Sequence, residues 1–174
     1  PHISTGEMFR QHVSAGTELG RRVDSILKSG AYVPDEITVE MLGERIAEPD
    51  ARAGFILDGF PRTGPQVEAL DDLIGADGLD TLVLFEVDED ALVERLLARG
   101  RADDTEDTIR NRFEVYREQT APLLEIYGSR GIVVNVDGLG EIDEVTDRIL
   151  SVLETQNVER KTHDEITSQP EVGP

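Results

Sequence analysis

One stretch constrains this chain more than any other: an apolar run that ends in an aspartate and a glycine-proline turn. Residues 54–62 read Gly-Phe-Ile-Leu-Asp-Gly-Phe-Pro-Arg. Consecutive apolar residues bounded by glycines predict a short buried strand. Asp58 then stands at its carboxyl end, where open α/β sheets bind ligands, and Arg62 can hold a phosphate with its planar guanidinium. The alternative is a buried strand followed by an ordinary polar turn.

The acidic composition restricts the classes of partner. The 174 residues include 37 Asp and Glu against 17 Lys and Arg, a formal net charge of −20. Such a charge argues against non-specific binding to nucleic acid or to anionic membranes. Cysteine is absent, which excludes disulfides and thiolate metal sites. Because no bilayer-spanning run or signal peptide is visible, we expect a cytoplasmic protein, and a monomer.

The remaining apolar patterns alternate between strands and helices. The clearest strands are residues 81–87 and 132–136, with a very short one at the start of the chain. Apolar residues at helical spacing, with capping residues before them, predict helices over 7–13, 17–30, 35–46, 63–73, 88–99, 105–127 and 142–153. Pro122 should interrupt the sixth of these. Residues 155–174 are polar and unpatterned, and we expect a disordered tail.

Three motifs, in the same order along the chain, resemble those of the adenylate kinase family of nucleoside monophosphate kinases. They are Ile3-Ser4-Thr5-Gly6-Glu7-Met8-Phe9-Arg10, Asp58-Gly59-Phe60-Pro61-Arg62, and Gly100-Arg101-Ala102-Asp103-Asp104 with Arg112 further on. The resemblance covers residues 1–154. It implies an α/β fold, a three-layer P-loop-NTPase-like parallel sheet flanked by helices. It also implies the magnesium-dependent reaction ATP + AMP ⇌ 2 ADP.

The resemblance further implies an AMP-binding flap over about residues 5–47. Thr5 would contact the adenine and Arg10 the phosphate, although Thr5 could instead cap a helix and Arg10 be a solvated helix residue. Gln66 would hydrogen-bond the base. The other AMP-binding residues implied in this way are Ala31, Tyr32, Val33, Gly59, Phe60, Pro61, Arg62, Arg101 and Arg112.

A short lid over about residues 99–108 is the second implied site. Arg99 would bind ATP, while Arg62, Arg101 and Arg112 would be catalytic. Phosphoryl transfer needs several positive groups around the phosphoryl group that moves. The alternative is a solvated loop whose arginines pair with nearby carboxylates. Asp58 would hold Mg²⁺, commonly through water. Because the lid is short and lacks cysteine, we expect no zinc.

One departure from the family is large. Its members open with a strand, a glycine-rich phosphate loop and a lysine, and neither Lys28 nor Lys161 follows such a loop. We therefore expect the first, central strand and the phosphate loop to be missing, as in a fragment. Such a chain should bind ATP very weakly and be inactive. The alternatives are an inactive AMP-binding relative and a UMP/CMP kinase; Thr63-Gly64-Pro65-Gln66 resembles the adenylate type.

Overall fold

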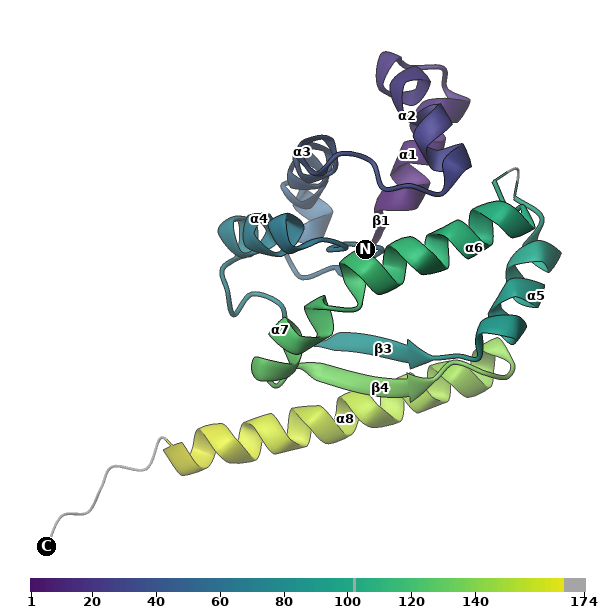
Figure 1. The fold of residues 1–174 in the computed structure, drawn as a ribbon. Coiled ribbons are helices and arrows are strands. Elements are labelled where there is room, and N and C mark those ends of the chain that lie inside the picture. The colour runs from purple at the N-terminus through teal and green to yellow at the C-terminus, as the bar shows by residue number, and fades with distance from the viewer. Residues whose placement is uncertain (102, 168–174) are drawn as a thin grey trace, which may run out of the picture.

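The computed structural model describes residues 1–101 and 103–167 (Figure 1). Within these residues, each strand is followed by one or more helices. The elements are β1 His2–Ser4, α1 Thr5–Ser14, α2 Glu18–Ser29, α3 Asp35–Ile46, the 3₁₀ turn η1 Pro49–Ala51, β2 Ile56–Asp58, α4 Gly64–Ile74, β3 Leu82–Glu86, α5 Glu89–Arg99, α6 Glu106–Val115, the π-helical turn η2 Tyr116–Thr120, α7 Leu123–Ser129, β4 Val133–Asp137 and α8 Ile142–Thr167.

Polar residues fix where several helices begin. The hydroxyls of Thr17, Thr63 and Thr105 accept hydrogen bonds from backbone N–H groups at the starts of α2, α4 and α6. The Asp88 carboxylate does the same for α5. Each satisfies donors that a first helical turn leaves free. At the other end of α2, Gly30 adopts the left-handed conformation, φ 79°, which glycine reaches without steric cost.

The four strands pair as two separate parallel sheets in the described part of the chain. β1 pairs with β2, placing Ile3 opposite Leu57 and Ser4 opposite Asp58. β3 pairs with β4, placing Leu84 opposite Asn135, and the two pairs share no strand. The α/β class with parallel strands and flanking helices is confirmed.

The prediction of a buried strand after Gly54 was wrong in one respect. β2 is a strand, but Ile56 is 68 % exposed. On the second sheet, Phe85 of β3 is 49 % exposed. The physical reason is that each of these strands has one hydrogen-bonded neighbour among the described elements. Apolar side chains that a central strand would bury therefore face solvent.

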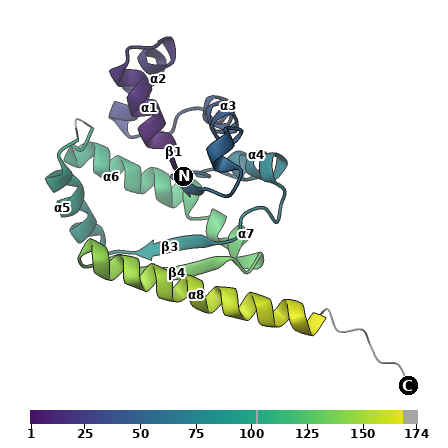
Figure 2. The same ribbon diagram turned by 180° about the vertical axis from the view of Figure 1, so that it is seen from behind.

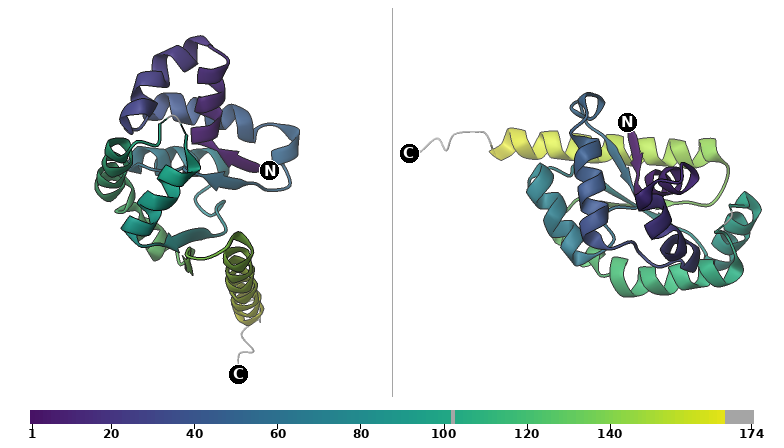
Figure 3. Two further views of the ribbon diagram at one scale, coloured as in Figure 1. Left: turned by 90° about the vertical axis from the view of Figure 1, so that its right-hand side faces the viewer. Right: turned by 90° about the horizontal axis from the view of Figure 1, so that it is seen from above.

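Helices pack on both sides of these strands. α8 runs alongside β4 in both views of the chain (Figures 1 and 2). α1 and α2 lie at the opposite end of the molecule from α8, which Figure 3 shows again from the side. Three clusters of buried side chains form the core: Ile3, Leu42, Phe60 and Leu70; Phe9, Val23, Val33 and Met41; and Val67, Leu123 and Tyr127.

Two further predictions concern the second half of the chain. The helix over 105–127 is interrupted before Pro122, as expected, and continues as α7. The disordered tail over 155–174 is wrong for residues 155–167, which continue α8. These residues include Glu159, Arg160 and Lys161, types with high helix propensity, so the helix continues beyond its apolar period. Residues 168–174 lie outside the described part.

Candidate functional site

A small cavity lies where β2, α1 and the segment between α2 and α3 meet. Its volume is about 50 Å³, smaller than the roughly 300–1,000 Å³ of typical ligand pockets. Six residues predicted to bind AMP line it: Ala31, Tyr32, Val33, Gly59, Arg62 and Gln66. Its other lining residues are Gly6, Phe9, Leu27 and Thr38. Segments far apart in the sequence therefore converge on one cavity.

Gln66 is held rigidly in the wall of this cavity. Its side chain is 2 % exposed, and both ends of its amide are engaged. Oε1 accepts a hydrogen bond from the backbone N–H of Arg62 at 2.8 Å. Nε2 donates to Oδ1 of Asp35 at 2.6 Å. The sequence analysis placed Asp35 only at the start of a helix and missed this contact.

The Arg62 side chain folds back over the turn from which it comes. Its Nε donates to the Gly59 carbonyl at 2.7 Å, and its guanidinium lies 5.0 Å from the centre of the Tyr32 ring. That distance is typical of a cation–π contact. The Tyr32 hydroxyl is 2.8 Å from Oγ1 of Thr120, which in turn donates to the Arg62 carbonyl. Arg62 and Tyr32 together occupy much of the space beside Gln66.

Thr5 and Arg10 lie next to the cavity on α1. Ser4, rather than Thr5, is the N-cap of α1, so the capping alternative for Thr5 does not hold. Thr5 is instead buried, and its hydroxyl donates to the Gly59 carbonyl at 3.0 Å. Burial is the largest cause that lowers the pKa of Arg10, followed by the charge of Arg101, while Asp103 acts in the opposite direction. Arg10 therefore lies within electrostatic reach of the predicted lid.

The predicted lid contains a compact cluster of ion pairs. The Asp104 side chain is fully buried. It accepts hydrogen bonds from Arg99 at 2.8 and 2.9 Å and from Arg112 at 3.2 Å, while Arg112 also pairs with Asp103. The hydrogen bond from Arg99 is the largest cause that holds the pKa of Asp104 below its ordinary value. The same contact raises the pKa of Arg99.

Arg101 differs from the other two lid arginines. Its backbone N–H donates to Oδ2 of Asp104 at 3.2 Å, and the residue is exposed. Ala102, the next residue of the predicted lid, lies outside the described residues. The structure shows the ion pairs of the second expectation, whereas phosphate binding by these arginines stays a prediction. The loop carries the ion pairs of the solvated-loop alternative, and its arginines lie near Arg10.

Helix α6 links the lid to the cavity. The Thr108 hydroxyl donates to the Lys28 carbonyl at 3.0 Å, and Nδ2 of Asn111 donates to the Ser29 carbonyl at 2.7 Å. A side chain at Gly30 would meet the backbone of Thr108 at 2.9 Å, so only glycine allows this approach. These contacts dock α6 on the end of α2 and bring Arg112 to the rim of the flap.

Asp58 lies apart from the cavity at the carboxyl end of β2. Its Oδ2 is 3.3 Å from Nε2 of His2, and the two side chains are 59 % and 57 % exposed. Among the described residues, no group of three or more His, Asp or Glu side chains could hold a metal ion directly. An exposed single carboxylate fits a contact to Mg²⁺ through water, because that ion usually keeps several water ligands. Phe60 is buried in the core, and it does not line the cavity, nor does Pro61.

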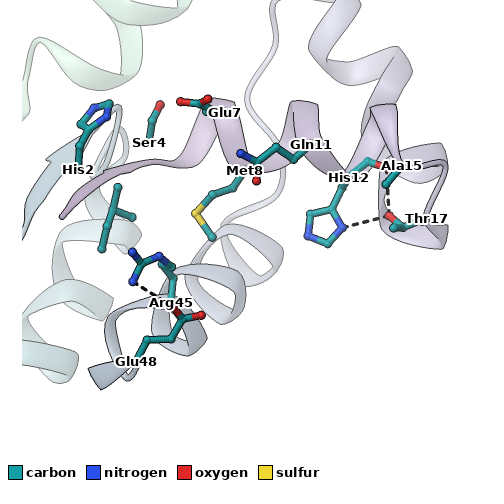
Figure 4. Close-up of a pocket in the computed structure, with 11 residues that line it drawn as sticks. His2, Ser4, Glu7, Met8, Gln11, His12, Ala15, Thr17, Arg45 and Glu48 are labelled. Atoms are coloured by element: carbon teal, nitrogen blue, oxygen red, sulfur yellow. Dashed lines mark hydrogen bonds and ion pairs between the residues drawn. The ribbon is translucent and has the colours of Figure 1, made fainter. Parts of the chain in front are cut away.

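A larger pocket, of about 670 Å³, lies along the outer side of β1 and α1 (Figure 4). Its wall includes His2, Glu7, His12, Arg45 and Glu48, and it contains none of the predicted site residues. Two of its polar side chains are engaged with neighbours: His12 with Thr17, and Arg45 with Glu48 and Asp50. We therefore place the candidate site at the smaller cavity.

Known proteins match the chain over the same stretch that carries these residues. A family model described as "Adenylate kinase" matches residues 1–132. The chain belongs to the adenylate kinase family. It is 54 % identical over 160 residues to an adenylate kinase of Nocardioides sp., covering 88 % of this chain and 84 % of the relative.

Two other relatives agree with this assignment. An adenylate kinase of Nocardia farcinica is 52 % identical over 155 residues, with the same coverage of 88 % and 84 %. One of Kocuria rhizophila is 52 % identical over 160 residues, covering 88 % of this chain and 85 % of the relative. Within the described residues, no helix is both long and apolar enough to cross a membrane.

Proposed function

We propose that this adenylate kinase family member transfers a phosphoryl group between ATP and AMP to give two molecules of ADP, with AMP held in the small cavity. The cavity itself is the observation that carries the proposal. It brings together an amide for the base, an aromatic ring and an arginine for the phosphate, from three separate segments. The relatives at 54 % and 52 % identity are named adenylate kinases, which supports the same reaction.

The residues have distinct roles in this proposal. Gln66 bonds the adenine edge, and Ala31, Tyr32 and Val33 enclose the base and ribose. Arg10 and Arg62 bind the AMP phosphate, and Thr5 fixes the turn at Gly59 against the base. The cavity is too small for a nucleotide. Arg62 must therefore leave the Gly59 carbonyl and the Tyr32 ring when AMP binds, and its guanidinium then becomes free to hold phosphate.

The lid arginines act on the phosphoryl group that moves. Arg101 is exposed, whereas Arg99 and Arg112 are held by Asp104. We propose that Arg101 contacts the transferred group and Arg99 contacts ATP from a lid over residues 99–108, and that Arg112 contacts the transferred group from helix α6, which follows the lid. Positive charge placed in advance stabilises the charge that spreads over the phosphoryl oxygens in the transition state.

Mg²⁺ completes the proposed site. Asp58 would hold it through water, and the ion would neutralise charge on the ATP phosphates. We propose no zinc, and a cytoplasmic monomer that binds neither nucleic acid nor membranes. The net charge of −20 supports the last point. Sedimentation of the purified chain tests the monomer directly.

The deciding experiment compares acceptor nucleotides on one preparation. Calorimetric titration of AMP, CMP and UMP should show tight binding for AMP alone, and a coupled assay of ADP formation should follow the same order. Tighter binding of CMP or UMP would identify a kinase for a different acceptor. Because this chain is expected to bind ATP very weakly, ADP formation is also measured on a chain that carries the family's phosphate loop ahead of residue 1. AMP binding without ADP formation in that longer chain, even with Mg²⁺ and ATP in excess, would indicate a binding protein and contradict the transfer reaction.

A further inference from the structure

We propose that Asp35 determines the choice of base by fixing the orientation of the Gln66 amide. This inference rests on the proposed function, because it assumes that the cavity holds a nucleoside monophosphate. The observation that carries it is the pair of hydrogen bonds on the two ends of one buried amide. One comes from a backbone N–H that can only donate, and the other goes to a carboxylate that, when ionised, can only accept.

The two partners together allow a single orientation. Rotation of the Gln66 amide by half a turn would place Oε1 against the Asp35 carboxylate and Nε2 against the Arg62 N–H. Two acceptors would then face each other, as would two donors, in a residue that is 2 % exposed. A buried polar group that loses its partner costs on the order of 1–3 kcal/mol. The amide therefore cannot rotate to suit a different base.

Asp35 is itself fixed in position. It is the first residue of α3, and its second oxygen, Oδ2, accepts a hydrogen bond from the Thr63 hydroxyl at 3.0 Å. That hydroxyl also caps α4, accepting from the backbone N–H of Gln66 at 3.3 Å. The carboxylate thus bridges the start of the flap helix α3 and the start of α4, and the amide is held at both its backbone and its side chain.

The groups left over on Gln66 define what it can recognise. A primary amide has two N–H donors and two acceptor lone pairs. With one of each used by Asp35 and Arg62, one donor and one acceptor remain, on an amide that lines the cavity. Adenine offers the matching pair, an amino donor at C6 and an acceptor at N1. A 6-oxo purine offers the reverse order, an acceptor at C6 and a donor at N1.

This difference makes inosine monophosphate the sharpest probe. It differs from AMP at that edge of the base, while its ribose and phosphate are the same. An amide that cannot rotate should favour AMP, whereas one that can rotate should serve both nucleotides. Asp35 is therefore a positioning residue, acting through Gln66, and its loss should change the ratio of the two affinities more than it changes phosphate binding.

The test measures both dissociation constants by calorimetry for the wild-type chain and Asp35→Asn. A hydrogen bond to a charged group corresponds to roughly a tenfold factor or more, so we expect the preference for AMP over inosine monophosphate to fall about tenfold. Asparagine can present either an acceptor or a donor to the amide, whereas Asp35→Glu keeps a carboxylate that can only accept and should retain most of the preference. Asp71→Asn is the matched control, because it alters a partly buried ion pair, with Arg130, on the same helix as Gln66 without touching the amide, and it should leave the ratio unchanged.

A double mutant separates positioning from a general structural role. If Asp35 acts through the amide, Asp35→Asn should not alter the ratio further in a Gln66→Ala background. An equal loss of affinity for both nucleotides in Asp35→Asn, or an unchanged ratio, would overturn the inference. Should that variant fail to fold, Asp35→Ala gives the same ratio test, with Asp35→Glu as the variant that should retain the preference. A wild-type chain that binds neither nucleotide would instead contradict the proposed function.

Discussion

The AMP cavity and the lid hold their arginines in different ways. In the cavity, Arg62 rests on a neutral carbonyl and an aromatic ring. In the lid, Arg99 and Arg112 are bound to the fully buried carboxylate of Asp104. A phosphate that approaches Arg62 therefore displaces weak, uncharged partners. A phosphate that approaches Arg99 or Arg112 must share the arginine with the charged Asp104 carboxylate or displace that carboxylate.

From this difference we expect the two regions to contribute differently to stability and to nucleotide binding. The Arg62 hydrogen bond has one charged partner, its own guanidinium, whereas each hydrogen bond from Arg99 or Arg112 joins a guanidinium to a carboxylate, and bonds of the second kind are the stronger. The lid cluster should therefore contribute more to the stability of the empty protein. The cavity should give up its internal interactions more readily when a nucleotide arrives. Substitutions in each region can test this comparison, beginning with the one expected to have the largest effect.

Removal of the lid carboxylate should have the largest effect on stability. Asp104→Ala would leave Arg99 and Arg112, 36 % and 26 % exposed, without the partner that holds them. Because both arginines retain some solvent, we expect the free energy of unfolding to fall by about 2–3 kcal/mol rather than by the full value for a buried pair. Urea unfolding measures it, with Asp107→Ala at an exposed position as control. Equal, small losses in both variants would mean that the cluster is only a surface network.

Substitution of the cavity arginine, Arg62, should lower AMP affinity more than it lowers stability. In Arg62→Ala the AMP dissociation constant should rise at least tenfold, since one charge-assisted hydrogen bond to phosphate is removed. The melting temperature should change little, because in the empty protein the guanidinium is held by a hydrogen bond to a carbonyl and by one aromatic ring. Calorimetry and thermal unfolding on the same preparation give both numbers. A large fall in melting temperature with unchanged AMP affinity would make Arg62 structural.

The sequence predicted where helices begin better than it predicted which side chains contact one another. Helix caps at Thr17, Asp88 and Thr105 follow from local hydrogen bonding, and local rules are visible in sequence. The Gln66 to Asp35 contact spans 31 residues. It depends on how α3 packs against α4, which no local pattern encodes. Exposure of Ile56 was missed for the same reason, since burial of a strand depends on neighbours that its own residues do not specify.

The Asp103-Asp104 pair shows how far a local charge pattern can be interpreted. Two carboxylates within five residues of Arg99 are a visible signal in the sequence. The sequence predicted them only as alternative ion-pair partners and not as holders of the arginines. Full burial of the Asp104 side chain changes that interpretation, because a buried carboxylate must be paired. Which of the two carboxylates is buried depends on how the chain folds, and the charge pattern of the sequence does not specify it.

Acid should weaken the ion-pair cluster around Asp104. The pKa of Asp104 is lowered in the folded protein, chiefly by the hydrogen bond from Arg99. The stability from this group is therefore complete above its unfolded value, near 3.8, and is lost as the pH falls through the folded value. The difference in unfolding free energy between wild type and Asp104→Ala should stay constant above about pH 5 and narrow below about pH 4. A constant difference down to about pH 2 would contradict the pairing.

The smallest expected effect separates two roles for Thr5. Thr5 is 4 % exposed, and its hydroxyl donates a hydrogen bond to the Gly59 carbonyl. In Thr5→Val, which keeps the shape, that buried carbonyl loses a donor, and the free energy of unfolding should fall by about 1 kcal/mol. AMP affinity should fall less than in Arg62→Ala, because the turn shifts while the phosphate contact remains. Thr5→Ser retains the hydroxyl and should keep most of the unfolding free energy and most of the AMP affinity. A loss of AMP affinity as large as in Arg62→Ala, with the free energy of unfolding unchanged, would show that the hydroxyl contacts the base directly rather than stabilising the turn at Gly59.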